Sequence, residues 1–170
     1  MNPALSPIRL ILVSPMYGGN LGSVARLCAN FDLRDVVLVT PLCSPTDEEA
    51  LKYAVRESKE VLAGFRTVST LEEALKGCTF SIAFNRKDNQ PISKPWSWAY
   101  AAELLGQPGT TALVFGREDN GLTNEEVEQC SVECAIPTSP FITSMNLSHS
   151  IAVVLSGIYA AADERQAALT

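Results

Sequence analysis

The sequence predicts an α/β protein in which a mostly parallel sheet is flanked by helices. Apolar runs rich in β-branched residues alternate along the chain with segments of helical periodicity. Polar segments follow several of these runs, as loops do in successive βαβ units. A chain of 170 residues, of which 46% are apolar, can bury one substantial core. We therefore expect a single domain over residues 1–170.

Six short apolar segments bounded by turn residues are predicted to be strands. The first of them, IRLILVSP, is nearly continuous in its apolar character, which is typical of a strand buried on both faces. The predicted strands are 8–15, 35–40, 66–69, 79–85, 110–116 and 132–137.

Capping signals indicate where several helices begin. A Thr followed three residues later by Glu is a capping-box pattern, and it occurs at Thr46, Thr70 and Thr123. The first of these predicts a helix that runs towards Gly64, and Pro95 is expected in the first turn of another helix. The predicted helices are 21–30, 46 towards 64, 70–77, 95–105, one that begins at 123, and 144–161.

Composition and charge restrict the class of protein. The net charge of −6 gives no overall attraction to nucleic acid, although a local basic patch would be enough for binding. The sequence starts without a signal-peptide pattern, and its longest apolar run, 151–162, is too short to span a bilayer. The five cysteines form no metal-site pattern. We therefore expect a cytoplasmic protein with no bound metal and no membrane segment.

Polar segments that follow the strands are the candidate ligand-binding loops, because ligands bind beyond the carboxyl ends of parallel strands. MYGGNLGSVAR has neither the spacing of a dinucleotide fingerprint nor the Gly-Lys-Ser/Thr of a P-loop. Asn20 is then either a helix cap or a site residue, and Arg26 either a surface residue or a site residue. Gly116 would let another molecule approach the backbone, while Arg117 and Glu118 need partners or water. The four loops are SPMYGGN, FNRKDNQ, GREDNGLT and PTSPFITSMN.

Two other features have ordinary explanations beside functional ones. The single histidine, His149, is more readily a core or surface residue than a catalytic base, because no Ser-His-Asp or Cys-His arrangement is evident. The aromatic residues of PWSWAY could stack on bases, but such residues more often fill a core or a subunit interface. The strand-helix alternation by itself would also permit a flavodoxin-like nucleotide or flavin binder.

Three segments taken together resemble one family. GGNLGSVAR, LVFGREDNGLT and IPTSPFITSMNLSHSIAVVL occur in the order and spacing of the three motifs of the SpoU (TrmH-like) branch of the SPOUT RNA methyltransferases. The resemblance covers nearly the whole chain and is greatest to TrmJ-like tRNA 2′-O-methyltransferases. It implies a SPOUT-type fold with a C-terminal trefoil knot, with the knot and the cofactor pocket in roughly 110–165. It also implies S-adenosyl-L-methionine (AdoMet) as cofactor, tRNA as the foremost RNA partner, and a homodimer.

The implied activity is methyl transfer from AdoMet to a ribose 2′-hydroxyl, foremost at nucleotide 32 of the tRNA anticodon loop. The alternatives are the wobble nucleotide 34, rRNA, or a non-catalytic RNA-binding protein of the same fold.

The resemblance also implies which residues form the site. Arg26 would hold an RNA phosphate and stabilise the developing alkoxide. Asn20 would orient the ribose or Arg26, and Glu118 would fix Arg26 or Arg117. The implied catalytic residues are Arg26, Asn20, Glu118, Ser144 and Asn146. The implied cofactor-binding residues are Phe84, Asn85, Arg86, Gly116, Ile136, Ser144, Met145 and Asn146. Candidates for further phosphate contacts are Arg9, Arg34, Arg56, Arg86, Lys87 and Lys94.

Overall fold

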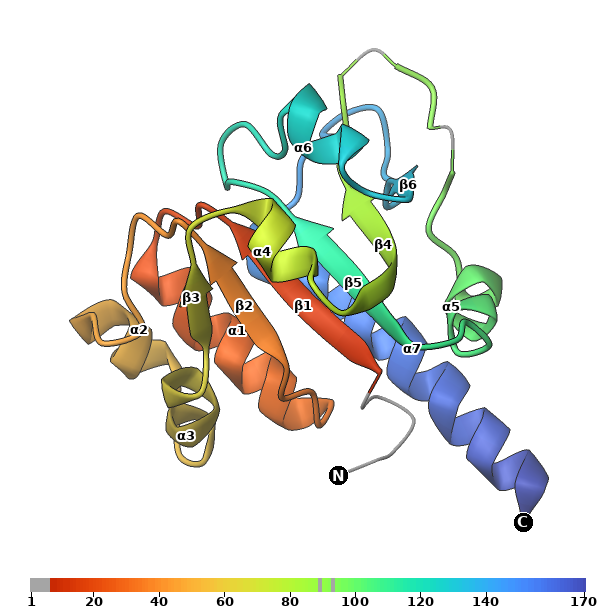
Figure 1. Ribbon diagram of the computed structural model, residues 1–170, viewed down its shortest axis with the longest axis horizontal. Coiled ribbons are helices and arrows are strands. Elements are labelled where there is room, and N and C mark those ends of the chain that lie inside the picture. The colour runs from red at the N-terminus through yellow and green to blue at the C-terminus, as the bar shows by residue number, and fades with distance from the viewer. Residues whose placement is uncertain (1–6, 89, 93) are drawn as a thin grey trace.

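A six-stranded sheet organises the chain (Figure 1). The computed structural model describes residues 7–88, 90–92 and 94–170. Within those ranges every strand pair is parallel and the strand order is β3-β2-β1-β5-β4-β6, which confirms the predicted parallel α/β fold. The strands are β1 (Ile8–Val13), β2 (Val36–Val39), β3 (Arg66–Val68), β4 (Cys78–Phe84), β5 (Thr110–Phe115) and β6 (Val132–Cys134).

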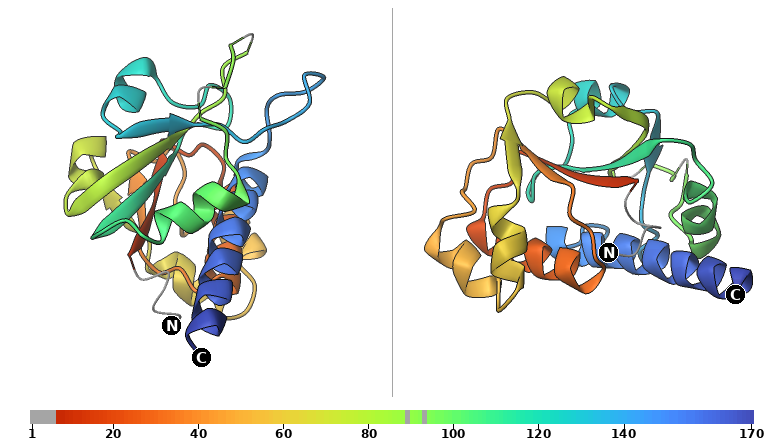
Figure 2. Two further views of the ribbon diagram at one scale, coloured as in Figure 1. Left: turned by 90° about the vertical axis from the view of Figure 1, so that its right-hand side faces the viewer. Right: turned by 60° about the horizontal axis from the view of Figure 1, so that its bottom comes forward.

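Helices cover both faces of the sheet, but unequally (Figure 2). Alternate strand residues point to opposite faces, so Leu10 and Leu12 belong to one apolar core and Ile11 and Val13 to the other. The larger core lies against α1, α2, α3, α5 and α7, and the smaller one against α4 and α6. The helices are α1 (Gly18–Asn30), α2 (Glu48–Tyr53), α3 (Ser58–Ala63), α4 (Leu71–Leu75), α5 (Trp98–Leu104), α6 (Asn124–Glu128) and α7 (Leu147–Leu169).

The glycines of MYGGNLGSVAR serve helix packing. A Cβ atom at Gly22 would stand 2.2 Å from the carbonyl oxygen of Ala50, so only glycine lets α2 lie this close to α1. A Cβ atom at Gly18 would lie 3.2 Å from Asp47, and one at Gly19 would lie 3.3 Å from Tyr53, so these two glycines also lie close to α2. This close packing explains a glycine-rich strand-to-helix junction that lacks the dinucleotide spacing.

The single helix predicted from Thr46 towards Gly64 is wrong. The chain forms α2 and α3 instead, separated by a turn in which Arg56 has a φ of 52°. The hydroxyl of Thr46 lies 2.8 Å from that of Ser44 and caps no helix. Asp47 is the residue before α2, and its carboxylate accepts from the backbone N–H of Ser44 at 2.8 Å. A neighbouring acidic side chain therefore reorganised the turn that the capping pattern had indicated.

The capping box predicted at Thr123 is confirmed, Thr70 caps its helix without the reciprocal bond to the Glu73 side chain, and Pro95 does not lie where it was predicted. Thr123 forms the full capping box with Glu126, and the Thr70 hydroxyl accepts from Glu73 N–H at 3.1 Å. Pro95, expected in the first turn of a helix, lies before α5 in a parallel bridge with Ala135. The prediction for Pro95 is wrong because the chain pairs with the end of β6 before it turns into the helix.

The last helix is longer than predicted. Helix α7 begins after Asn146 and extends to Leu169, eight residues past the predicted end at 161. No helix in 7–88, 90–92 and 94–170 is long and apolar enough to cross a membrane. The trefoil threading implied by the family resemblance stays a prediction.

Candidate active site at the carboxyl ends of the strands

Three loops meet beyond β4, β5 and β6 and enclose a cavity of about 440 Å³. They are three of the four loops indicated by the sequence, namely FNRKDNQ, GREDNGLT and PTSPFITSMN. The volume is in the range of small-molecule sites, which is about 300–1,000 Å³. Seven of the eight predicted cofactor residues line the cavity, and these are Phe84, Asn85, Arg86, Gly116, Ile136, Ser144 and Met145.

Stacked aromatic rings form the floor of the cavity. Phe84 ends β4 and Phe115 ends β5, and the two residues are partners in the sheet register. Their rings stack at a centroid distance of 4.7 Å with 6° between the planes, and Trp96 packs edge-on against Phe84 at 5.4 Å. Trp96 and Tyr100 are buried, whereas Trp98 is exposed. Two aromatic residues of PWSWAY therefore belong to the core beneath the site.

The loop after β5 folds back on itself above Gly116. A Cβ atom on Gly116 would lie 2.2 Å from the carbonyl carbon of Gly121, so the close approach predicted for another molecule is made by the chain itself. Backbone bonds of 3.1 and 3.0 Å join Arg117 and Gly121 in both directions. The side-chain oxygen of Asn85 accepts from the N–H of Leu122 at 3.3 Å, which ties this loop to the one after β4.

Arg117 is held by an ion pair and serves as a fixed part of the cavity wall. Its guanidinium donates two hydrogen bonds of 3.0 and 2.9 Å to the carboxylate of Glu126. Burial would raise the pKa of Glu126, but hydrogen bonds from Arg117 and Thr123 outweigh it and hold that pKa below its ordinary value of 4.5. The hydrogen bonds that Arg117 donates to Glu126 in turn raise the pKa of Arg117 above its ordinary value.

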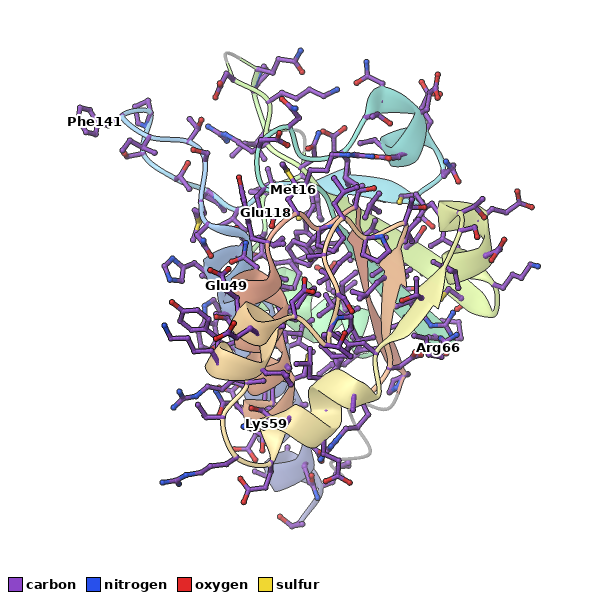
Figure 3. The ribbon with its side chains drawn as sticks, turned by 90° about the vertical axis from the view of Figure 1, so that its left-hand side faces the viewer. Met16, Glu49, Lys59, Arg66, Glu118 and Phe141 are labelled. Atoms are coloured by element: carbon purple, nitrogen blue, oxygen red, sulfur yellow. The ribbon has the colours of Figure 1, made fainter. Side chains whose placement is uncertain are left out.

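Glu118 joins the loop after β5 to the start of α1. Its carboxylate accepts from the backbone N–H groups of Met16 at 2.9 Å and Tyr17 at 3.0 Å (Figure 3). It also accepts from the side-chain amide of Asn20 at 3.0 Å. Helix α1 has no side-chain cap of its own, so this distant carboxylate supplies the negative charge that a helix N-terminus favours. The expectation that Glu118 fixes Arg117 is wrong, since Arg117 pairs with Glu126.

The strand order explains why the cavity lies where it does. Strand β1 is flanked by β2 and β5, so the chain switches direction across the sheet between β1 and β5. Such a switch point opens a crevice beyond the strands and is the usual ligand site in parallel sheets. Here the Glu118 hydrogen bonds bridge that crevice. The cavity is consequently displaced to the side of β4, β5 and β6.

Arg86 contributes a half-buried cation to the cavity. It follows β4 and lines both the main cavity and a smaller adjoining one. Its Nε and Nη1 atoms are buried and have no hydrogen-bond partner among the described residues. Arg86 was predicted as a cofactor-binding residue and as a candidate for a phosphate contact. Its orphaned donors mark it as the polar group of the cavity that most needs a ligand.

The loop before α7 forms the outer wall of the cavity and caps the helix. Ser144 and Met145 line the cavity. Asn146 is the N-cap of α7, and its side-chain oxygen accepts from Ser148 N–H at 2.9 Å and His149 N–H at 3.4 Å. Asn146 does not line the cavity, and its side chain is engaged with the helix. The loop also projects from the body of the protein, with Phe141 exposed at its tip (Figure 3).

Arg26 and Arg9 differ from the rest of the predicted site. Arg26 is exposed on α1, does not line the cavity, and has no hydrogen bond or ion pair with any described residue. Arg9 is unavailable to a phosphate, because it bonds to Asp35 at 2.8 Å and to the carbonyls of Ala74 and Lys76. The structure thus brings together Glu118, Asn20 and the cavity loops, and leaves Arg26 outside them.

Several residues that line the cavity were not predicted from the sequence, because nothing in their local pattern distinguishes them from ordinary loop residues. Asp88 accepts a hydrogen bond of 2.5 Å from the Thr143 hydroxyl and thereby joins the loops after β4 and β6. Thr138 and Ser150 also line the cavity. A signal was available for Asp88 and Thr138, which lie within the FNRKDNQ and PTSPFITSMN loops that the sequence had indicated.

The thiols and carboxylates add no nucleophile or metal centre within the described part of the chain. All five cysteines are free there. Burial, followed by the negative charges of Glu118 and Asp47, raises the pKa of the Cys43 thiol to about 11. Thiols with such a pKa stay protonated near neutral pH. Among residues 7–88, 90–92 and 94–170, no group of three or more His, Cys, Asp or Glu side chains is placed to hold a metal ion.

The fold and the loop architecture are those of an RNA-methylase family. The model of the SpoU rRNA Methylase family matches residues 7–156, and the chain belongs to that family. It is 36% identical over 153 residues to the tRNA (cytidine/uridine-2′-O-)-methyltransferase TrmJ of Klebsiella pneumoniae, covering 88% of this chain and 62% of that protein. It is 37% identical over 159 residues to the tRNA (cytidine-2′-O-)-methyltransferase TrmJ of Methanocaldococcus jannaschii, and the match covers 89% of this chain and 67% of that protein.

Solved structures agree with this assignment. A probable methylase family protein from Haemophilus influenzae superposes with a TM-score of 0.87 at 28% identity, covering 95% of this chain and 69% of that one. A probable methyltransferase from Bordetella pertussis superposes with a TM-score of 0.85 at 30% identity, and the match covers 95% of this chain and 99% of that one. The chain spans between 59% and 67% of the length of the first three curated relatives.

Proposed function

We propose that this protein is an AdoMet-dependent methyltransferase that acts on the ribose 2′-hydroxyl of tRNA. The observation that carries the proposal is the cavity of about 440 Å³, whose three loops lie within the segment that the family model matches, in a chain similar to TrmJ tRNA methyltransferases. A flavin or nucleotide binder is disfavoured because Glu118 bridges the crevice that such proteins use.

The cavity residues fit the chemical character of AdoMet. Phe84, Phe115, Ile136 and Leu147 offer apolar surface for an adenosine group. Arg86 offers unpaired donors for an anionic group. When bound, AdoMet supplies a methyl group on a sulfonium leaving group.

The reaction would form a carbon–oxygen bond and break a carbon–sulfur bond and an oxygen–hydrogen bond. The ribose 2′-oxygen bonds to the methyl carbon, the carbon–sulfur bond breaks, and the hydroxyl proton leaves to solvent. The products are the 2′-O-methyl ribose, S-adenosylhomocysteine and a proton. Arg26 has its guanidinium exposed and unpaired among the described residues, so it is available to bind a phosphate beside the ribose and to stabilise the developing alkoxide.

Glu118 and Asn20 take a positioning role in this scheme. Their mutual hydrogen bond and the bonds from Met16 and Tyr17 hold the start of α1 to the cavity loop. Arg26 lies six residues beyond Asn20 on the same helix, about 9 Å along its axis. The orientation of Arg26 relative to the cavity thus depends on a contact made by Glu118.

We further propose nucleotide 32 of the anticodon loop as the target, and a cytoplasmic homodimer as the acting form. The target follows the TrmJ resemblance, and the cytoplasm is where tRNA substrates are found. The dimer is supported by apolar surface along α7, where Val153 is exposed, and near the start of α1, where Tyr17 is exposed. Light scattering should give twice the chain mass at micromolar concentration, and a monomer mass would contradict the dimer.

Mass-spectrometric mapping of ribose methylation tests the activity. Unmodified tRNA transcripts are incubated with AdoMet and either the wild-type protein or the Arg26→Ala variant as matched control. We expect a 2′-O-methyl group at nucleotide 32 with the wild-type protein only. Methylation at nucleotide 34 would correct the target but keep the reaction. Binding of tRNA without any methylation would instead support a non-catalytic RNA-binding protein.

A further inference from the structure

Arg86 is the cationic side chain of the cavity whose hydrogen-bond donors remain unused. Three cationic residues line the cavity, namely Arg86, Lys87 and Arg117. Lys87 donates to the side-chain oxygen of Asn124 at 2.7 Å, and Arg117 is paired with Glu126. No described residue accepts from the Nε or Nη1 of Arg86, and both atoms are buried. The unused donors of the cavity cations are therefore concentrated on one guanidinium.

The acidic residues around Arg86 do not neutralise it. Glu118 is engaged with the start of α1, Asp88 accepts from Thr143, and Asp119 accepts from the backbone N–H of Asn120. Glu133 lines the smaller cavity together with Arg86, yet no ion pair joins the two in the described part of the chain. Two buried guanidinium nitrogens without acceptors lose solvation that no protein contact replaces. An anion bound at Arg86 would offset that cost.

We propose that Arg86 recognises the carboxylate of the methionine part of AdoMet and of S-adenosylhomocysteine. This inference rests on the proposed function, because it takes those molecules as the cavity's ligands. A carboxylate can accept two parallel hydrogen bonds from one edge of a guanidinium, formed by Nη2 with either Nε or Nη1. Arg86 lines two adjoining cavities and its Nε and Nη1 atoms are buried, which favours a small ligand over a phosphate on the outer surface of an RNA. Arg86 thus fixes the amino-acid end of the cofactor, opposite the adenosine end.

Calorimetry with two matched ligands tests the assignment. The first is S-adenosylhomocysteine, and the second is its decarboxylated analogue, which keeps the adenosine, sulfur and amine. The Arg86→Gln variant should bind S-adenosylhomocysteine about tenfold to a hundredfold more weakly than the wild-type protein, because a charge-assisted bidentate contact is lost. The same substitution should leave the affinity for the decarboxylated analogue nearly unchanged. Arg86→Lys should recover part of the discrimination between the two ligands.

A neighbouring variant serves as the control for charge. Lys87→Gln removes one positive charge from the adjacent residue, whose ammonium group already has a partner. It should reduce the affinity for S-adenosylhomocysteine by much less than Arg86→Gln does. The thermal unfolding midpoint of the ligand-free Arg86→Gln protein should stay equal to the wild-type value or rise, since a buried unpaired charge is removed. A fall in that midpoint together with equal losses for both ligands would assign Arg86 a structural role and overturn the inference.

The remaining outcomes separate this inference from the proposed function. If the wild-type protein binds S-adenosylhomocysteine and Arg86→Gln binds it equally well, the inference fails and the proposed function stands. If Arg86→Gln loses affinity only for tRNA, the guanidinium serves an RNA phosphate and the inference is again overturned. If the wild-type protein binds neither ligand, the proposed function fails and the assignment of Arg86 fails with it.

Discussion

The carboxylate of Glu118 accepts a hydrogen bond of 3.0 Å from the side-chain amide of Asn20, across 98 residues of sequence. Glu118 lies in the loop that follows β5, and Asn20 lies in the first turn of α1. The same carboxylate accepts from two backbone N–H groups at the start of that helix. The contact links a wall of the cavity to the helix that carries Arg26.

We expect Glu118→Ala to lower the free energy of unfolding by about 2–3 kcal/mol, because the N–H groups of Met16 and Tyr17 lose their acceptor. Asn20→Ala removes one donor and should lower it by about 1 kcal/mol. Urea unfolding of both single variants and the double variant gives the coupling energy, which should be about 0.5 kcal/mol or more. Strict additivity of the two losses would show that the bond contributes nothing of its own.

Arg26→Ala should nearly abolish methyl transfer and leave the affinity for AdoMet intact. Arg26 lies outside the cavity, so cofactor contacts are untouched, whereas a contact to phosphate or developing oxyanion is lost. The loss should be about 3 kcal/mol, or roughly a hundredfold in rate. Single-turnover transfer to tRNA and calorimetry with AdoMet measure the two quantities. Loss of AdoMet binding, or near-normal turnover, would contradict the role given to Arg26.

Asn146→Ala should destabilise the protein through α7. The N–H groups of Ser148 and His149 would lose the oxygen that caps the helix, at a cost of about 1 kcal/mol. Asn146→Asp keeps a capping acceptor and should retain most of the stability, so the two variants differ mainly in the cap. Chemical denaturation measures both. Should Asn146→Ala weaken AdoMet binding at unchanged stability, Asn146 would act on the cofactor directly.

Gly116→Ala should impair both folding stability and AdoMet binding. The added methyl group would collide with Gly121 and force open the loop that lines the cavity, at about 3 kcal/mol. Gly22→Ala is the matched control, because its methyl group would collide with α2 away from the cavity. That variant should lose about 2 kcal/mol of stability and keep its affinity for AdoMet once folded. Equal effects of the two variants on AdoMet affinity would argue against a specific role for the Gly116 loop.

The ion pair of Arg117 and Glu126 should make stability depend on acidic pH. The folded-state pKa of Glu126 is lowered, so its contribution is fully present above the unfolded pKa near 4.5 and is lost as the pH falls through the folded value. Glu126→Gln removes this titration. Unfolding free energies measured from pH 6 down to about pH 3 should therefore fall more steeply for the wild-type protein. Parallel curves for the two proteins would show that the pair contributes no pH dependence.

The sequence by itself determined the parallel α/β architecture and the loops that form the cavity. Apolar runs and helical periodicity are local patterns, so the six strands and the box at Thr123 could be predicted from neighbouring residues. Other contacts can override a local pattern, and they did so at the starts of two helices. Asp47 organised the turn that Thr46 had indicated, and the pairing of Pro95 with Ala135 delayed the start of α5.

Only the tertiary structure decided how the site is assembled. The partners of Glu118 lie about a hundred residues away, and the approach to Gly116 is made by a loop of the same chain. Arg26 and Arg86 are both arginines in motif-like segments, yet one is exposed on a helix and the other has buried donors. Sequence spacing carries no information on such burial. The hydrogen bonds and charges that distinguish these residues arise when strand order brings distant loops to one edge of the sheet.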